Sequence, residues 1–129
     1  MVFKIKILAL IFLAIYSKSW SQNTNQLDSL NRVLRQPMAD TSKVLLLEQI
    51  ALKVMYSKPS AALQYTTEGL ELADKIKFLK GKSRILNRLG TIYRLTSNYG
   101  ASLKAHLEAI QISEELNDQE GLCKIYNNV

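Results

Sequence analysis

The sequence predicts an all-α fold in which pairs of antiparallel helices repeat along the chain, and two observations support it. Over residues 83–112 the apolar residues recur at helical spacing, interrupted once by the polar turn Thr96-Ser97-Asn98. The same pattern returns at an offset of 40 residues on both sides of this stretch. Pairs that match at this offset include Leu63 with Leu103, Glu68 with Glu108, Leu70 with Ile110, Ile85 with Ile125 and Asn87 with Asn127.

Several residues in the central stretch have a distinctive spacing, namely Leu89-Gly90, Tyr93, Asn98-Tyr99, Leu103 and Ala109. In this spacing the stretch resembles one unit of the tetratricopeptide repeat (TPR) family, with Ser102 at the family's first second-helix alanine and His106 at its core aromatic position. The resemblance implies a right-handed solenoid of antiparallel helix pairs. A period near 40 resembles the long-period members, because the commonest unit has roughly 34 residues.

The first 21 residues have the organisation of a secretory signal peptide. Lysines precede an apolar run over residues 7–16, and the small residues Ser19 and Ser21 fit the cleavage pattern. We expect cleavage between Ser21 and Gln22, and export to a periplasm or beyond. The alternative is an uncleaved membrane anchor, which the short run disfavours because a spanning helix needs about 20 apolar residues.

Residues 22–39 are predicted to form a polar segment and a short capping helix. Residues 22–26 are polar and are expected to be loose. Four apolar residues between positions 27 and 34 mark one face of a helix that ends before Gln36-Pro37, because the residue before a proline disfavours helical geometry. We expect this helix to cap the apolar end of the stack.

Residues 40–80 are predicted to form the first repeat. A helix over residues 42–56, capped by oxygens of residues 40–42, turns at Lys58-Pro59 into a second helix that ends near Ile76. The first helix aligns with the next copy at an offset of 39, so its turn is expected to be one residue shorter. Residues predicted to face inward are Val44, Leu47, Ile50, Ala51, Val54, Ala62, Leu63, Leu70 and Ala73, with Gly69 in the position that Ala109 holds in the next copy.

Residues 81–120 are predicted to form the second repeat, with links over residues 77–82 and 117–121. Tyr93 and Tyr99 are placed to fill the gap around its central turn. Residues 121–129 are predicted to be the truncated first helix of a third repeat, whose side chains would form an open apolar edge. This edge predicts self-association. The edge residues are Ile125, Tyr126 and Val129.

Composition excludes several classes of function. The formal charge is +6, but three of the 17 basic residues lie in the first 21 residues, which leaves 14 against 11 acidic ones. So small an excess does not predict nucleic-acid binding. Cys123 is the one cysteine, and no Cys/His cluster suited to zinc occurs, so no disulfide within one chain, metal or other cofactor is expected.

No residue pattern predicts catalysis, so the chain is not expected to be an enzyme. Gly81-Lys82-Ser83 lacks the further glycine of a phosphate-binding loop, since Ile76 stands at that position. The one histidine, His106, is expected to be a core residue and not a phosphoacceptor, and Cys123 is expected to be a small packing residue. Glu114 and Glu115 are neighbours that point in different directions on a helix.

The resemblance implies that the first helix of each pair lines a concave peptide-binding groove. This groove would be cationic with amide side chains, and would hold an acidic segment or a C-terminal carboxylate through charge-assisted hydrogen bonds. The alternative is that these residues form solvated faces, and that Asn87 and Asn127 brace neighbouring repeats. The predicted groove residues are Arg84, Asn87, Arg88, Thr91, Arg94, Lys124, Asn127 and Asn128, with Leu45, Glu48, Leu52 and Met55 from the first repeat.

The predicted function is therefore protein or peptide binding outside the cytoplasm. An exported leader followed by long-period repeats resembles the N-terminal sensor region of a longer bacterial signalling protein. One alternative is a free-standing periplasmic adaptor. Another is the front part of a histidine kinase whose catalytic region follows residue 129.

Overall fold

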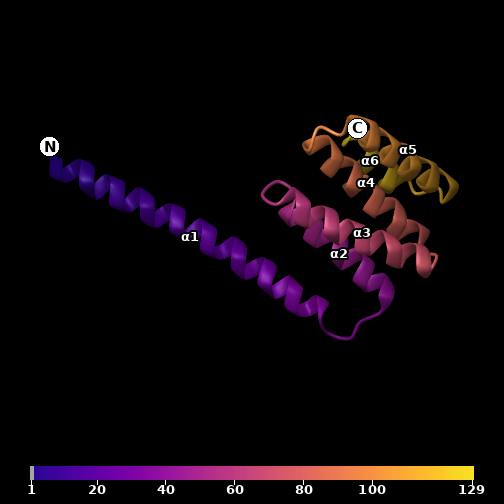
Figure 1. Ribbon diagram of the computed structural model, residues 1–129, viewed down its shortest axis with the longest axis horizontal. Helices are drawn as coiled ribbons and strands as arrows, with labels where there is room; N and C mark the ends of the chain where they lie inside the picture. Colours follow the sequence, from indigo (N-terminus) through magenta and orange to yellow (C-terminus); the bar gives the residue numbers. More distant parts are fainter. Residues whose placement is uncertain (1) are drawn as a thin grey trace. The chain divides into compact units, whose positions relative to one another are not determined.

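The structure of the protein is a computed structural model that describes residues 2–129, apart from the side chains of residues 12–24. Helices and short turns account for this stretch, and no β-strand occurs among residues 2–129. The prediction of an all-α fold is therefore confirmed. The helices are α1 (Val2–Leu34), α2 (Asp40–Val54), α3 (Pro59–Lys75), α4 (Leu79–Leu95), α5 (Tyr99–Glu115) and α6 (Gln119–Tyr126) (Figure 1).

Helix α1 belongs to a unit of its own, residues 1–36, and α2 to α6 form the second unit, residues 37–129. Residues 22–26, which were expected to be loose, instead lie within α1. The helix continues through them because residues 2–36 contain neither Gly nor Pro to interrupt it. The expected capping of the stack by residues 27–34 stays a prediction.

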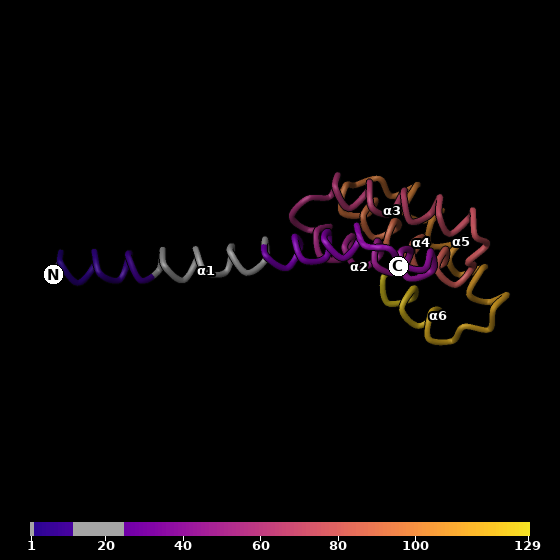
Figure 2. The backbone as a smooth tube through the Cα atoms, turned by 90° about the horizontal axis from the view of Figure 1, so that it is seen from below, coloured from indigo at the N-terminus to yellow at the C-terminus, as the bar shows by residue number. Residues whose placement is uncertain are grey.

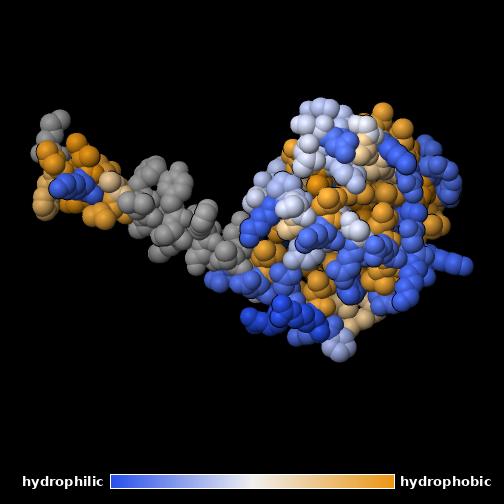
Figure 3. Space-filling view, in the orientation of Figure 1, coloured by the Kyte–Doolittle hydropathy of each residue, from blue (hydrophilic) through white to orange (hydrophobic). Residues whose placement is uncertain are grey.

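The N-terminal part of α1 carries apolar side chains that are exposed to solvent. Between residues 2 and 11 they surround the first turns of the helix (Figure 3). Among the described residues, no helix combines the length and the apolar character that a membrane span requires. The expected cleavage position after Ser21 lies among residues 12–24, outside the described side chains, so the signal peptide also stays a prediction.

Helix α4 is the central element of the second unit. Each of α2 to α6 packs against its neighbour in the chain, and α4 packs in addition against α2 and α6 (Figures 1 and 2). Successive helices are antiparallel because only short turns join them. On the face seen in Figure 3, apolar patches of this unit lie between hydrophilic side chains.

The turns after α3, α4 and α5 share one conformation. Their left-handed residues are Lys77, Ser97 and Asn117, with φ of 56°, 62° and 53°. In each turn the next N–H donates to a carbonyl five positions earlier, as from Asn98 to Tyr93 at 2.8 Å. Such bonds satisfy the last carbonyls of a helix. Because the conformation recurs every 20 residues, the backbone repeats as well as the sequence.

Helices α4 and α6 begin earlier than predicted. They start at Leu79 and Gln119, so residues 77–82 and 117–121 are short turns followed by helix and not links. A side-chain cap explains the early start of α6, since the Asp118 carboxylate accepts from the Gly121 amide at 3.1 Å. The cap residue of α4, Phe78, makes no such bond.

The first repeat is one residue shorter than the second because α2 is two residues shorter than α4, whereas the turn that follows α2 is one residue longer. Helix α2 has 15 residues, against 17 in α4, while the turn at residues 55–58 is not shorter than that at residues 96–98. The predicted shortening of the turn is therefore wrong, since it falls in the helix. The predicted cap is also wrong, because Ala39 precedes the helix without a side-chain bond and Asp40 lies in its first turn.

The predicted core of the first repeat is largely confirmed. Its α2 residues are at most 4% exposed, as are Ala62 and Ala73 on α3, whereas Leu63 and Leu70 are half-buried. The contacts between helices repeat as the sequence does. Ile85 lies against Gly69 between α4 and α3, and Ile125 joins the cluster around Ala109 between α6 and α5. The α2 residues in this core are Val44, Leu47, Ile50, Ala51 and Val54.

Four side chains near the C-terminal edge differ from prediction. Tyr99 and Leu103 on α5 are 67% and 54% exposed, so Tyr99 does not fill the gap at the turn. Cys123 is exposed and not a packing residue. Ile125, expected at an open edge, is only 1% exposed. Tyr99 and Leu103 lie outside the buried face of α5, which consists of Ser102, Ala105, His106, Ala109, Ile112 and Ser113.

The residues that resemble part of a phosphate loop connect three helices instead. Lys82 Nζ lies 2.8 Å from Asp74 of α3 and 3.3 Å from Glu108 of α5, and these carboxylates, Asp74 first, raise the Lys82 pKa above its ordinary value. The Ser83 hydroxyl donates to the Ala109 carbonyl at 3.0 Å. These contacts fix the position of α4 between α3 and α5.

We expect opposite results for two glycine substitutions. A Cβ at Gly90 would lie 2.7 Å from three atoms of the His106 ring, so Gly90→Ala should lower the free energy of unfolding by about 1 kcal/mol or more. A Cβ at Gly69 would lie 2.7 Å from the terminal Cδ1 of Ile85 and at ordinary contact distance from Ile85 Cγ1 and Leu47 Cβ. Because Cδ1 is the movable end of its side chain, Gly69→Ala should be neutral or stabilising through helix propensity. Urea denaturation of both variants measures this difference. Equal changes in stability would contradict close packing at Gly90.

Candidate functional site

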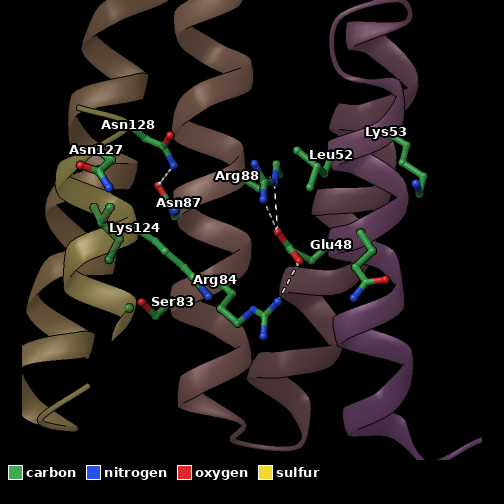
Figure 4. A pocket seen from close by; sticks show the side chains of 13 residues that line it. Glu48, Leu52, Lys53, Ser83, Arg84, Asn87, Arg88, Lys124, Asn127 and Asn128 are labelled. Atoms are coloured by element: carbon green, nitrogen blue, oxygen red, sulfur yellow. Dashed lines mark hydrogen bonds and ion pairs between the residues drawn. The ribbon is translucent and has the colours of Figure 1, made fainter. Parts of the chain in front are cut away.

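A pocket opens between α2, α4 and the C-terminal residues around α6, within the second unit. Its volume is about 740 Å³. It contains four cationic side chains and one carboxylate, together with amide groups (Figure 4). The lining residues are Glu48, Gln49, Leu52 and Lys53 from α2, Ser83, Arg84, Asn87 and Arg88 from α4, and Gly121, Lys124, Ile125, Asn127 and Asn128.

Glu48 is the centre of the charge arrangement. Its side chain is 5% exposed, and both oxygens accept hydrogen bonds from arginines on α4 (Figure 4). Arg88 donates to Oε1 from Nε at 3.0 Å and from Nη2 at 2.5 Å, whereas Arg84 donates to Oε2 at 3.3 Å. The carboxylate is therefore paired, as a buried charge must be. Because two cations face one anion, the cluster keeps a positive charge.

Amide side chains form the opposite wall of the pocket. The Asn128 Nδ2 group donates to Asn87 Oδ1 at 3.2 Å, which connects the end of α6 to α4 (Figure 4). Asn127 is exposed, and its Nδ2 makes a long contact of 3.9 Å to the sulfur of Cys123. Asn87 therefore braces the next helix, as in the alternative prediction for this residue, while Asn127 does not.

Lys124 supplies a cation at the solvent side. Its Nζ donates to Glu120 at 2.5 Å within α6, and both side chains are more than half exposed. This hydrogen bond lowers the Glu120 pKa below its ordinary value. An exposed pair of this kind contributes little to stability, so Lys124 can exchange Glu120 for another anion.

Not all predicted groove residues reach the pocket. Thr91 is 3% exposed, and its hydroxyl donates to the Asn87 carbonyl one turn earlier in α4, at 3.1 Å. Its side chain therefore bonds its own helix and does not face the pocket. Arg94 is exposed to solvent and does not line the pocket. Leu45 and Met55 do not line the pocket either. Met55 is 2% exposed and belongs to the core. The residues that the structure does bring together are Glu48, Leu52, Arg84, Asn87, Arg88, Lys124, Asn127 and Asn128.

Sequence reasoning missed the role of Glu48 and several lining residues. Glu48 stands among apolar residues on α2, and an arginine follows it at an offset of 36 and another at 40. In a chain with a period near 40, opposite charges at these offsets lie on adjacent first helices, and this signal could have predicted the ion pairs. No such pattern marks the other missed residues, which are Gln49, Lys53, Ser83, Gly121 and Ile125.

His106 lies in the core between α4 and α5, as predicted. It is 2% exposed, and neither ring nitrogen has a hydrogen-bond partner. Burial lowers its pKa below the ordinary value of 6.5, and the charge of Arg94 lowers it further. Among the described residues, no group of three His, Cys, Asp or Glu side chains is placed to hold a metal ion.

Arg88 and Arg84 should differ in their effect on stability. Arg88→Ala removes two of the three bonds to buried Glu48, so it should lower the free energy of unfolding by about 2 kcal/mol or more. Arg84→Ala should cost less than about 1 kcal/mol, because this side chain is 39% exposed and makes one longer bond. Urea denaturation followed by circular dichroism measures both. Similar losses would contradict the unequal pairing.

His106 should make stability depend on pH. The unfolded chain binds a proton near pH 6.5, whereas the folded chain does so only at lower pH. The free energy of unfolding should therefore fall as pH drops below about 6.5, and level off below the folded pKa. His106→Phe has no such proton to bind, and its stability should fall less over the same interval. Parallel pH profiles of the two proteins would rule out this role.

In comparisons with known proteins, the chain matches no family model, no curated protein and no solved structure.

Proposed function

We propose that the protein binds a peptide through a carboxylate, either in an acidic segment or at a C-terminus. The observation that carries this proposal is the pocket itself, in which cationic and amide side chains from three regions surround one shared space (Figure 4). Its four cations exceed its single carboxylate, which favours an anionic ligand. Its volume, about 740 Å³, is within the usual range for small-ligand pockets and suits a few peptide residues.

The chemistry of the donors supports a carboxylate in particular. An arginine guanidinium presents paired N–H groups whose geometry matches the two oxygens of a carboxylate, and such bonds are stronger than those between neutral groups. Arg84 lies between Glu48 and Lys124 and is partly exposed. Asn127 adds an amide that can hydrogen-bond a peptide backbone. Leu52 supplies apolar surface for an aliphatic side chain.

We further propose that residues 40–129 form a TPR-like, right-handed solenoid, with the peptide in its groove. Three features support this assignment, namely the TPR-like spacing, the identical turns at 20-residue intervals, and the equivalent contacts of Ile85 and Ile125. The pocket residues come from the first helix of each pair, as the TPR resemblance implies. In this proposal the chain is a binding module and not an enzyme.

The protein would act outside the cytoplasm, as the sensor part of a longer signalling protein. Two alternatives are a free-standing periplasmic adaptor and the front part of a histidine kinase. Any sequence after residue 129 distinguishes them, through a membrane span with catalytic motifs or further repeats. Self-association is a second proposed property, supported by Tyr126, which is 59% exposed, whereas the equivalent Leu86 is 3% exposed.

We expect the pocket cations to control binding of a labelled tetraglutamate peptide. Arg84→Gln combined with Lys124→Gln should weaken binding about tenfold or more, because each charge-assisted bond contributes about 1.5–3 kcal/mol. The matched control is Lys75→Gln combined with Lys104→Gln, which makes the same charge change on exposed residues outside the pocket. Fluorescence anisotropy compares the two. Equal losses of peptide affinity in the two double variants would mean that the basic side chains act only through the overall charge.

Export can be tested at the N-terminus. Expression of the full chain in a bacterium with a secretory pathway should give a protein that begins at Gln22, because the apolar run and Ser19 and Ser21 fit a cleavage site. Mass spectrometry of the purified protein identifies the first residue. A chain that keeps residues 1–21 and stays with the membrane would support the uncleaved anchor instead.

A further inference from the structure

The two arginines that bind Glu48 are not equivalent. Arg88 is 15% exposed and donates to Glu48 through two nitrogens, so its guanidinium is held in one place. Arg84 is 39% exposed and donates once, at 3.3 Å. Its remaining N–H groups are not bonded to Glu48. Arg84 is thus the arginine that can move at low cost.

Departure of Arg84 would not leave a buried charge without a partner. Glu48 Oε1 keeps both bonds from Arg88. Only Oε2 loses its donor, and this atom faces the pocket in which Arg84 and Arg88 lie (Figure 4). The strong penalty for an unpaired buried carboxylate is therefore avoided as long as Arg88 stays in place.

We propose that Glu48 is an internal competitor for the ligand carboxylate, and that Arg84 exchanges Glu48 for the ligand on binding. This inference rests on the proposed function, and it adds a specificity determinant to the same pocket. In the free protein the Glu48 carboxylate accepts the hydrogen bond from Arg84 that a ligand carboxylate would otherwise accept. Arg88 acts as a positioning residue, because it holds Glu48 and does not itself contact the peptide.

Competition by Glu48 would also restrict which ligands the pocket accepts. Without Glu48, the pocket would present four cations and no anion, and would attract anions of many kinds. With Glu48, a ligand must offer an acceptor that replaces a carboxylate bond to Arg84. A peptide carboxylate does so, whereas a neutral amide or carbonyl group does not. Glu48 thus lowers affinity and raises selectivity.

A double-mutant cycle on peptide binding tests this exchange. The probe is a fluorescein-labelled tetraglutamate peptide with a free C-terminus, titrated into the full chain, and the variants are Glu48→Gln, Arg84→Gln and the double variant. Glu48→Gln keeps the shape of the side chain but weakens its hold on Arg84, so affinity should rise about threefold or more. In the Arg84→Gln background the same substitution should change affinity less than twofold. Glu68→Gln, an equal charge change outside the pocket, is the control.

Each outcome has a distinct meaning. If Glu48→Gln strengthens binding equally in both backgrounds, Glu48 acts only by general repulsion, and the exchange at Arg84 is wrong. If Glu48→Gln leaves affinity unchanged or weakens it while the wild-type chain still binds, the inference fails but the proposed function stands. If tetraglutamate does not bind the wild-type chain or any variant, both fail.

A second measurement does not depend on the folding of a variant. In wild-type protein, the guanidinium Nη–H and Nε–H resonances of arginine side chains can be followed by nuclear magnetic resonance during titration with tetraglutamate, and Arg84 Nη2 is the group that bonds Glu48 in the free protein. The Arg84 signal should shift as its donor groups change partner. The Arg88 signal should move by only a small fraction of that shift. A larger shift at Arg88 would reverse the assigned roles, and no shift at Arg84 would overturn the proposal.

Discussion

A buried carboxylate on α2 constrains how the helices of this protein are arranged. Glu48 is 4% exposed, and its charge would be costly without partners. Both partners, Arg84 and Arg88, come from α4, so the ion pairs fix the distance and the rotation of α4 relative to α2. The two hydrogen bonds that Arg88 donates to one carboxylate oxygen are directional, so they hold α4 in register with α2 more strictly than apolar contacts do. The same interaction places two guanidinium groups on the wall of the pocket.

The helical repeat explains why the pocket side chains gather on one side of the second unit. First helices α2, α4 and α6 follow each other at nearly constant spacing, because the turns between helix pairs share one conformation. Side chains at equivalent positions of these three helices therefore lie on the same side of the unit. On the opposite side, second helices α3 and α5 contribute the small residues Gly69 and Ala109, against which Ile85 and Ile125 pack. The fold thus separates an apolar seam from a polar pocket.

Much of the fold could be predicted from the sequence, since it depends on local periodicity. Helical spacing and the offset of 40 located α2 to α5 and their buried faces. Features that depend on contacts between distant parts of the sequence were harder to predict. Tyr99 and Leu103 have the spacing of core residues, yet they are exposed because they lie outside the buried face of α5. The groove residues predicted on α4, on α6 and after it came from the TPR resemblance. The pairing of Glu48 with two arginines was missed, although opposite charges at offsets of 36 and 40 indicate it, because it also depends on the register between α2 and α4.

We conclude that the coupling between Glu48 and Arg88 holds α2 against α4. A double-mutant cycle on stability tests it most directly, with Glu48→Gln, Arg88→Gln and the double variant measured by urea denaturation. We predict a coupling energy of about 2 kcal/mol, because the side chains share two hydrogen bonds and both are largely buried. A coupling energy below about 0.5 kcal/mol, the usual limit of additivity for independent sites, would mean that Glu48 and Arg88 act independently.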